Sequence, residues 1–263
     1  MTRSEGRGPG KTVRIAIVTY PGMTALDAIG PYEVLRFAPG AEVRFVWHEP
    51  GPIMTDSGVL VLGATHSFDE TPAPDILLVP GGPGSAAAAV DDALLAWLRR
   101  AHRSTLWTTS VCTGALVLAA AGLLDGRPAT THWLAQPALR ALGADARPDE
   151  RIVRDGRIAT AAGVSAGIDL ALWLVGEVFG AEQAQTAQLI IEYDPQPPYD
   201  AGHVGKASRA VRLAATAQQA RTVVEPGNFG EFARLSAAVP QLAWRSAIRR
   251  VRVRGKVLRR PAT

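Results

Sequence analysis

The sequence predicts an α/β fold with a mostly parallel central sheet covered by helices. Short β-branched or apolar runs alternate along the chain with helical segments, which is the pattern of a layered α/β structure. The run at residues 76–80 is apolar throughout, as expected of a strand buried on both faces. Of the 263 residues, 47% are hydrophobic and 20% are charged, which is the composition of an ordinary globular protein and excludes global disorder.

The first half of the chain contains four predicted strands with helices between them. Each strand is short, is rich in β-branched or apolar residues, and is followed by Gly, Pro or a helix start. The strands are expected at residues 13–20, 42–47, 76–80 and 106–111. The helices are expected at residues 25–37, with Thr24 as the capping residue, and at 91–101 and 114–121.

The second half repeats the alternation and then changes character. We expect a short strand at 129–131, a helix at 133–142, and a hairpin turning at Asp155-Gly156 between strands 152–154 and 158–161. Two further helices are expected at 165–178 and 181–192. The Pro-rich segment 194–199 then ends the body, and one more helix is expected at 207–221.

Charge divides the chain at about the same place. Residues 206–263 contain 13 Lys and Arg against 2 Asp and Glu, a net charge of +11, whereas residues 1–205 have a net charge of −7. We therefore predict a flexible N-terminus at 1–11, one domain at 12–205, and a basic extension at 206–263 that is partly helical or disordered. Nucleic acid could be a partner only through the extension.

Composition also limits the compartment and the cofactors. Residues 1–11 are polar and Gly-rich, no apolar run is long enough for a membrane span, and we expect a cytoplasmic protein with no membrane partner. Cys112 is the one cysteine in the sequence, so an intramolecular disulfide is excluded. The five histidines have no metal-ligand spacing, so we expect neither a metal nor another cofactor.

Cys112 is the central candidate for chemistry. A predicted strand ends just before it and a predicted helix begins two residues later, so the thiol would stand on a strand–turn–helix elbow above the sheet edge. The backbone N–H groups that follow, including that of Thr113, would point at the same spot, and the helix N-terminus would lower the pKa of the thiol. The alternative is a buried, inert cysteine.

Four other residues could contribute to the same edge of the sheet. Gly81 and Gly82 follow another strand and could donate N–H groups to a developing anion, or could form a plain turn. Asp27 could place a carboxylate over the edge, or could be a first-turn acid that the helix dipole favours. His132 could form an activated pair with Cys112, or could be a structural histidine.

These motifs resemble the ThiJ/PfpI superfamily, which has a class I glutamine amidotransferase-like fold. The resemblance rests on Val-Cys112-Thr-Gly-Ala, on Val-Pro-Gly81-Gly82 and on Ala-Thr-Thr-His132-Trp. Segments 26–31, 161–169 and 191–195 are more similar to its isonitrile hydratase-like branch. The resemblance covers about residues 12–205. It implies a flavodoxin-like sandwich with helices on both faces, a homodimer and no cofactor.

The same resemblance implies roles for the site residues. Cys112 matches the elbow nucleophile, Asp27 the general acid or base, and Thr113 with the Gly81–Gly82 turn the backbone donors. His132 matches a histidine whose role varies between branches. The implied reaction is the hydration of a small electrophilic substrate, an isonitrile, to the N-substituted formamide.

Other functions stay open at this point. A glyoxalase-like enzyme or a natural-product tailoring enzyme would use the same residues. A ligand-sensing or DNA-associated protein is the alternative without catalysis, because related domains are fused to helix-turn-helix units in AraC-type regulators. The extension, broken at Gly227 and Pro240, is too short for that pair of units. Glutamine amidotransfer needs a His-x-Glu partner, which neither His132 nor His203 supplies.

Overall fold

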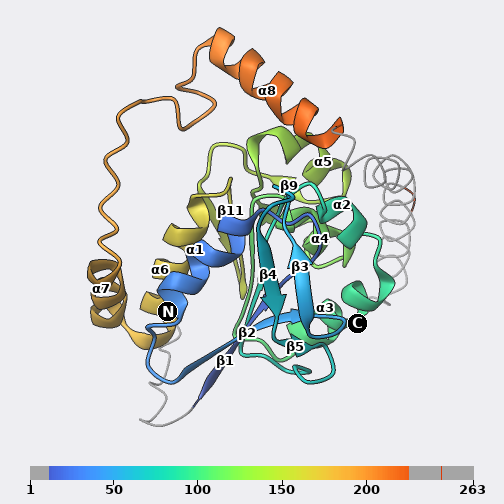
Figure 1. Cartoon of the computed structure of the whole chain (residues 1–263), viewed down its shortest axis with the longest axis vertical. Coiled ribbons are helices and arrows are strands. Elements are labelled where there is room, and N and C mark those ends of the chain that lie inside the picture. The colour runs from blue at the N-terminus through green and yellow to red at the C-terminus, as the bar shows by residue number, and fades with distance from the viewer. Residues whose placement is uncertain (1–11, 225–243, 245–263) are drawn as a thin grey trace, which may run out of the picture.

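The computed structural model describes residues 12–224 and Trp244, and it has a seven-stranded sheet at its centre (Figure 1). The strand order is β10-β11-β7-β6-β1-β2-β5, and every pairing in it is parallel except that of β10 with β11. The strands of this sheet are β1 (Val13–Val18), β2 (Ala41–Trp47), β5 (His66–Ser67), β6 (Ile76–Val79), β7 (Trp107–Val111), β10 (Ile152–Asp155) and β11 (Ile158–Ala161). The predicted mostly parallel sheet is confirmed.

Helices cover both faces of the sheet, which makes the flavodoxin-like sandwich that we expect (Figure 1). One group packs together on one face: α1 (Ala25–Leu35), α6 (Ala166–Phe179) and α7 (Ala181–Ile190). The other group packs around α4: α2 (Ser85–Ala88), α3 (Asp92–His102), α4 (Gly114–Ala120), and α5 (Gln136–Ala141) with its preceding 3₁₀ turn Trp133–Ala135.

The core lies between these layers. The central strand β6 is buried at every position, and β1 and β7 are buried at almost every one. Burial on both faces explains why the sequence of β6 is apolar throughout and not alternating. In β7 the buried positions include Thr108, Thr109 and Ser110. At the end of β1, the buried Tyr20 hydroxyl donates a hydrogen bond of 2.7 Å to the carbonyl of Pro80 after β6.

Because β1, β6 and β7 are adjacent and parallel, their carboxyl ends meet at one edge of the sheet. The segments that follow them are residues 19–24, the Gly81–Gly82 turn and Cys112. Open α/β sheets bind ligands at this edge. Topology alone thus brings together residues that lie up to about 90 positions apart in the sequence.

Several details differ from the prediction. The hairpin β3 (Gly51–Met54) and β4 (Val61–Ala64) lies outside the main sheet, and β8 (Pro128–Ala129) pairs with β9 (Asp145–Ala146) in another small sheet. Thr24 does stand at the N-cap of α1, but its side chain makes no capping hydrogen bond and donates instead to Asp56. The predicted Thr24 side-chain cap is therefore wrong.

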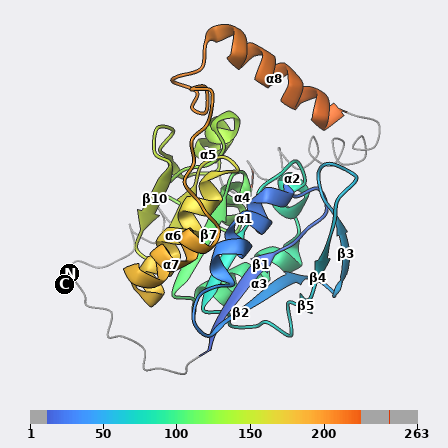
Figure 2. The same ribbon diagram turned by 60° about the vertical axis from the view of Figure 1, so that its left-hand side comes forward.

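The chain leaves the sandwich after α7. Residues 191–208 cross the surface as a long connection to α8 (Arg209–Val224), which confirms the helix expected at 207–221 (Figures 1 and 2). Both views place α8 at the same end of the molecule as α5. The predictions for 1–11 and for the extension beyond 224, other than Trp244, lie outside the described residues. No helix in the described segments is long and apolar enough to cross a bilayer.

Candidate active site

Cys112 stands on the sharp turn between β7 and α4, as the elbow pattern predicts. Its φ angle is +55°, a left-handed backbone conformation that is uncommon for residues other than Gly and Asn. Of the described residues other than Gly, Glu192 alone shares a positive φ. Such strain persists only where the surrounding structure enforces it, and it concentrates at functional sites.

Hydrogen bonds on both sides enforce this conformation. The backbone N–H of Cys112 donates to the carbonyl of Ala162 at 2.8 Å, after β11. The carbonyl of Cys112 accepts a 2.7 Å hydrogen bond from the buried Thr131 hydroxyl. Sequence reasoning did not single out Thr131, although it lies beside His132. Hydrogen bonds to Ala162 and from Thr131 thus hold the backbone of Cys112 on both sides.

The electrostatics of the thiol differ from the prediction. Burial raises the pKa of Cys112 well above its usual range, and the charge of Asp27 raises it further. The backbone N–H groups of Thr113 and Val164 act in the opposite direction, but they do not outweigh burial. The prediction that the helix start gives a lowered pKa of the thiol is therefore wrong, because desolvation of the thiolate dominates.

Asp27 lies beside Cys112, fully buried in the first turn of α1. The N–H of Gly81 donates to its Oδ2 at 2.8 Å. Burial raises the pKa of Asp27 to about 7, although the Gly81 N–H and the neighbouring thiol oppose the shift. Its Oδ1 is buried and has no hydrogen-bond partner in the described part of the chain. Asp27 can therefore hold a proton at neutral pH and give it up.

Gly81 and Gly82 are required for close backbone approach. A Cβ on Gly81 would lie 2.4 Å from the Thr113 nitrogen and 2.9 Å from the Cys112 Cβ. Gly82 has a φ of +130°, and a Cβ on it would lie 2.4 Å from the Thr24 nitrogen. The loop therefore packs directly against the elbow.

The predicted donor role of this turn needs correction. The Gly81 N–H is taken by Asp27, and the Gly82 N–H donates to the Thr113 hydroxyl at 2.8 Å. The Thr113 hydroxyl in turn lies 3.1 Å from the Gly82 carbonyl, to which it donates. Both glycine N–H groups thus position other site residues. The backbone donors that do face the sulfur are the N–H groups of Thr113 and Val164.

Cys112 opens into a cavity of about 530 Å³. Its lining is largely apolar, with polar groups at a few points: Thr24, Asp56, Gly82, Pro83, Ser85, Ala86, Cys112, Thr113, Leu116, His132, Leu134, Ala135, Ala138, Val164 and Gln219. Sequence reasoning missed Asp56, because a Thr-Asp-Ser-Gly segment reads as an ordinary turn. It also missed Gln219, which α8 contributes from the extension.

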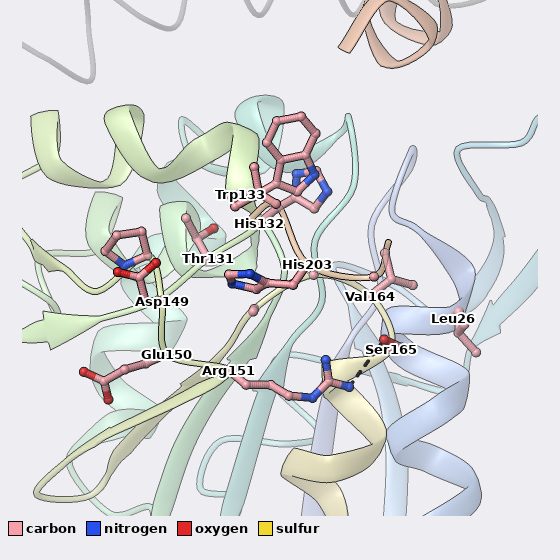
Figure 3. A pocket seen from close by; sticks show the side chains of 15 residues that line it. Leu26, Thr131, His132, Trp133, Asp149, Glu150, Arg151, Val164, Ser165 and His203 are labelled. Carbon is pink, nitrogen blue, oxygen red and sulfur yellow. Dashed lines mark hydrogen bonds between the residues drawn. The ribbon is translucent and has the colours of Figure 1, made fainter. Parts of the chain in front are cut away.

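His132 lines this cavity and a second one of about 550 Å³ (Figure 3). The second cavity is also lined by Arg151 and by His203 of the connection, whose ring points into it (Figure 3). Burial lowers the pKa of His132, so the ring is neutral near pH 7. Among the described residues, no hydrogen bond joins it to the Cys112 thiol, so the activated pair, one of the two alternatives left open by the sequence, is not formed here.

Residues that could hold a metal do not gather at this edge. Within the described segments, no group of three or more His, Cys, Asp or Glu side chains has the arrangement of a metal site. The thiol, the carboxyl group of Asp27 and the surrounding N–H groups can perform nucleophilic and acid–base chemistry.

The comparisons with known proteins agree with this geometry. The family model described as DJ-1/PfpI matches residues 13–177. The chain belongs to the DJ-1/PfpI family. An isonitrile hydratase from Pseudomonas putida is 42% identical over 199 residues, which cover 76% of this chain and 86% of that protein.

Two further relatives show the range of the family. A ThiJ/PfpI family protein from Pseudomonas syringae superposes with a TM-score of 0.78 at 35% identity, covering 90% of this chain and 93% of that one. The transcriptional regulator CdhR from Pseudomonas aeruginosa is 32% identical over 170 residues, 62% of this chain but 50% of the regulator. The family therefore includes both enzymes and regulators.

Proposed function

We propose that this DJ-1/PfpI family member is a cysteine-dependent hydratase that converts an isonitrile, R–N≡C, to the N-substituted formamide. The observation that carries the proposal is the pairing of a strained, buried Cys112 with a buried Asp27 whose pKa is about 7, at the head of a largely apolar cavity. The identity to a Pseudomonas putida isonitrile hydratase supports it.

The reaction needs a proton donor first. The terminal carbon of an isonitrile carries a lone pair, and its protonation makes the carbon electrophilic. Asp27 is suited to this step, since an acid with a pKa near the working pH is the most effective proton donor. The unpartnered Oδ1 of Asp27 is the atom that would present the proton.

The thiol then adds to the same carbon. The C–S bond forms as the S–H bond breaks, and the thiol proton passes to the carboxylate of Asp27, so the carboxyl group is restored. The product is a thioimidate, R–N=CH–S, on Cys112. The Thr113 and Val164 N–H groups stabilise negative charge on sulfur as the S–H bond breaks.

Water completes the reaction. It adds to the thioimidate carbon, the C–S bond breaks, and N-substituted formamide leaves with the thiol regenerated. Neither an oxidant nor a cofactor takes part in these steps. The apolar lining, which includes Leu116, Leu134 and Val164, suits an uncharged R group.

The test is mass-spectrometric detection of formamide after the full chain is mixed with cyclohexyl isonitrile. Wild type should give product, whereas Cys112→Ala should give none while it retains the wild-type circular dichroism spectrum. Turnover by Cys112→Ala would exclude covalent catalysis. Absence of product from wild type would exclude this substrate and turn attention to an α-oxoaldehyde on the same site.

The similarity to a regulator makes ligand sensing the second candidate. The described part of the extension contains one helix, α8, whereas a pair of helix-turn-helix units needs several. DNA binding through the basic extension would weaken steeply as salt rises. An electrophoretic shift that disappears when residues 206–263 are deleted, without any turnover in the full chain, would favour this candidate.

A further inference from the structure

Asp56 is a second carboxylate in the Cys112 cavity. It lies in the turn between β3 and β4, outside the main sheet. Two backbone hydrogen bonds hold this hairpin to the segment after β1: Asp56 N–H donates to the Met23 carbonyl at 3.0 Å, and Gly22 N–H donates to the Met54 carbonyl at 2.9 Å. The hairpin thus carries Asp56 to the functional edge of the sheet.

The carboxylate of Asp56 is anchored on one side only. The Thr24 hydroxyl donates to Oδ2 at 2.6 Å. The other oxygen, Oδ1, has no hydrogen-bond partner among the residues that the structure describes. Asp56 is half-buried and lines the cavity that Cys112 opens into. One oxygen is therefore fixed, while the other is available to a molecule in the cavity.

Thr24 connects the two carboxylates. Its hydroxyl holds Asp56, its N–H donates to the Gly81 carbonyl at 2.8 Å, and its carbonyl accepts from the Asp27 N–H. Gly81 in turn holds the carboxylate of Asp27. The positions of Asp27 and Asp56 are therefore coupled through a short run of backbone.

The charge of Asp56 also acts on the buried groups behind the cavity. Its negative charge raises the pKa of both Asp27 and Tyr20. His132, the other base in the cavity lining, is not among the groups that act on Asp27 or on Cys112. Of the two bases, Asp56 is therefore the one whose charge acts on Asp27.

The two carboxyl groups also have different environments. Asp27 is fully buried and retains a proton near pH 7, whereas Asp56 is half-buried and bound by a hydroxyl donor. Two carboxyl groups in unlike environments are a recurring way to provide an acid and a base in one site.

We propose that Asp56 is the general base that takes a proton from the water attacking the thioimidate on Cys112. This inference rests on the proposed isonitrile hydration and assigns its second half. Asp27 exchanges protons with the substrate in both halves of the reaction, whereas Asp56 acts in the second half, as the base for the attacking water.

The protons balance over this half-reaction. The water oxygen bonds to the thioimidate carbon, one water proton goes to Asp56, and the nitrogen takes the proton of Asp27. As the C–S bond breaks and the C=O bond forms, the hydroxyl proton returns to Asp27 and the proton on Asp56 passes to sulfur. Formamide leaves, and all three side chains are as they began.

The experiment compares Asp56→Asn with wild type in the full chain, using cyclohexyl isonitrile and rapid acid quench. Asn has the shape of Asp and its amide oxygen can still accept from Thr24, but it is not a base. We expect kcat to fall about 10²-fold, the typical contribution of a general base. We also expect intact-protein mass spectrometry to show one substrate mass added to Cys112 at close to one equivalent.

The matched control is Asp69→Asn, an exposed aspartate near the same hairpin that lines neither cavity. It should retain wild-type kcat and show no adduct at steady state. Thr24→Val supplies a second variant, since it removes the hydroxyl that holds Asp56 but keeps the carboxylate of Asp56 itself. It should show a smaller loss of kcat with partial accumulation of the same adduct.

The outcomes separate this inference from the proposed function. If wild type gives neither formamide nor adduct, isonitrile hydration itself is wrong. If wild type turns over and Asp56→Asn does so at the same rate, Asp56 is not the base. An Asp56→Asn protein that folds but forms no adduct would also overturn the assignment, as would an adduct that accumulates in His132→Gln instead.

Discussion

The Cys112 cavity has two walls that are built in different ways. The wall from the sandwich consists of buried groups, with Asp27 fully enclosed and Cys112 only 5% exposed. The opposite wall includes Gln219 of α8, and α8 is exposed along residues 209–221. The first wall is fixed by tertiary packing, whereas the helix of the second depends on its own Ala-rich sequence.

The difference indicates where change is tolerated. Substitutions in the sandwich wall are expected to change stability together with activity, because the same contacts hold the fold and the candidate site residues. Substitutions in α8 remove few contacts, so they can alter the shape of the opening without unfolding the protein. The following predictions test this contrast, in order of decreasing expected effect.

The largest effect is expected for Gly81→Ala. Its Cβ would lie 2.4 Å from the Thr113 nitrogen, so the loop and the elbow cannot both keep their positions. We expect a loss of nearly all turnover and of about 3 kcal/mol in the free energy of unfolding. Urea denaturation measures the latter. Gly63→Ala is the control, since nothing lies within 4 Å of its Cβ, and it should change stability by less than about 0.5 kcal/mol.

Asp27→Asn should reduce activity while it stabilises the fold. Loss of the proposed proton donor should lower kcat by about 10²-fold. The pKa of Asp27 is raised from 3.8 to about 7, so its contribution to stability is complete below pH 4 and is lost as the pH rises through 7. Relative to wild type, the variant should therefore gain stability between pH 4 and 7, by at most about 4 kcal/mol.

Urea denaturation of both proteins at pH 4.5 and at pH 8 measures this gain. The gain should be larger at pH 8, because wild type then carries a buried carboxylate. An equal difference at the two pH values would show that Asp27 titrates normally and would remove its role as the proton donor.

A smaller effect is expected from the strained backbone of Cys112. Its φ of +55° suits Gly better than Ala, because a Cβ in the left-handed region costs about 1 kcal/mol. Cys112→Gly should therefore be more stable than Cys112→Ala by about that amount, although both lack activity. Thermal denaturation of the two variants decides this, and a more stable Ala variant would mean that the elbow relaxes when the sulfur is removed.

The smallest effect is expected in the wall from α8. Gln219→Ala should leave the free energy of unfolding within about 0.5 kcal/mol of wild type, since α8 is exposed. It should widen the cavity and lower KM two- to threefold (about 0.5 kcal/mol) for an aryl isonitrile, with kcat unchanged. Gln185→Ala on α7, which lines neither cavity, is the control. A large loss of stability would show that α8 is part of the fold.

The sequence predicted the architecture well because the signals are local. The all-apolar run of β6, the Gly-rich turn after it and the break between β7 and α4 each reflect a short stretch of chain. Cys112 was recognisable for the same reason, since a reactive residue between a strand end and a helix start is a local pattern. The positions of most helices and of the β10–β11 hairpin followed in the same way.

Tertiary structure decided the properties that depend on residues far apart in the chain. The pKa directions of Cys112 and Asp27 follow from burial among several elements, and the first was opposite to the local expectation from the helix start. The Gly81 N–H donates to Asp27 and the Gly82 N–H donates to Thr113. These contacts form because adjacent parallel strands end at one edge of the sheet. From the sequence alone, Asp56 is interpreted as a turn residue. Its place in the cavity lining depends on the packing of the β3–β4 hairpin against residues 22–24.

The sequence by itself thus determined the family, the order of the elements and the place of Cys112 at the elbow, because each depends on a run of neighbouring residues. Only the tertiary structure decided which groups carry protons, which N–H groups remain for the sulfur, and which part of the extension lines the cavity. Desolvation and hydrogen bonding depend on everything that surrounds an atom, and that environment exists only once the chain has folded.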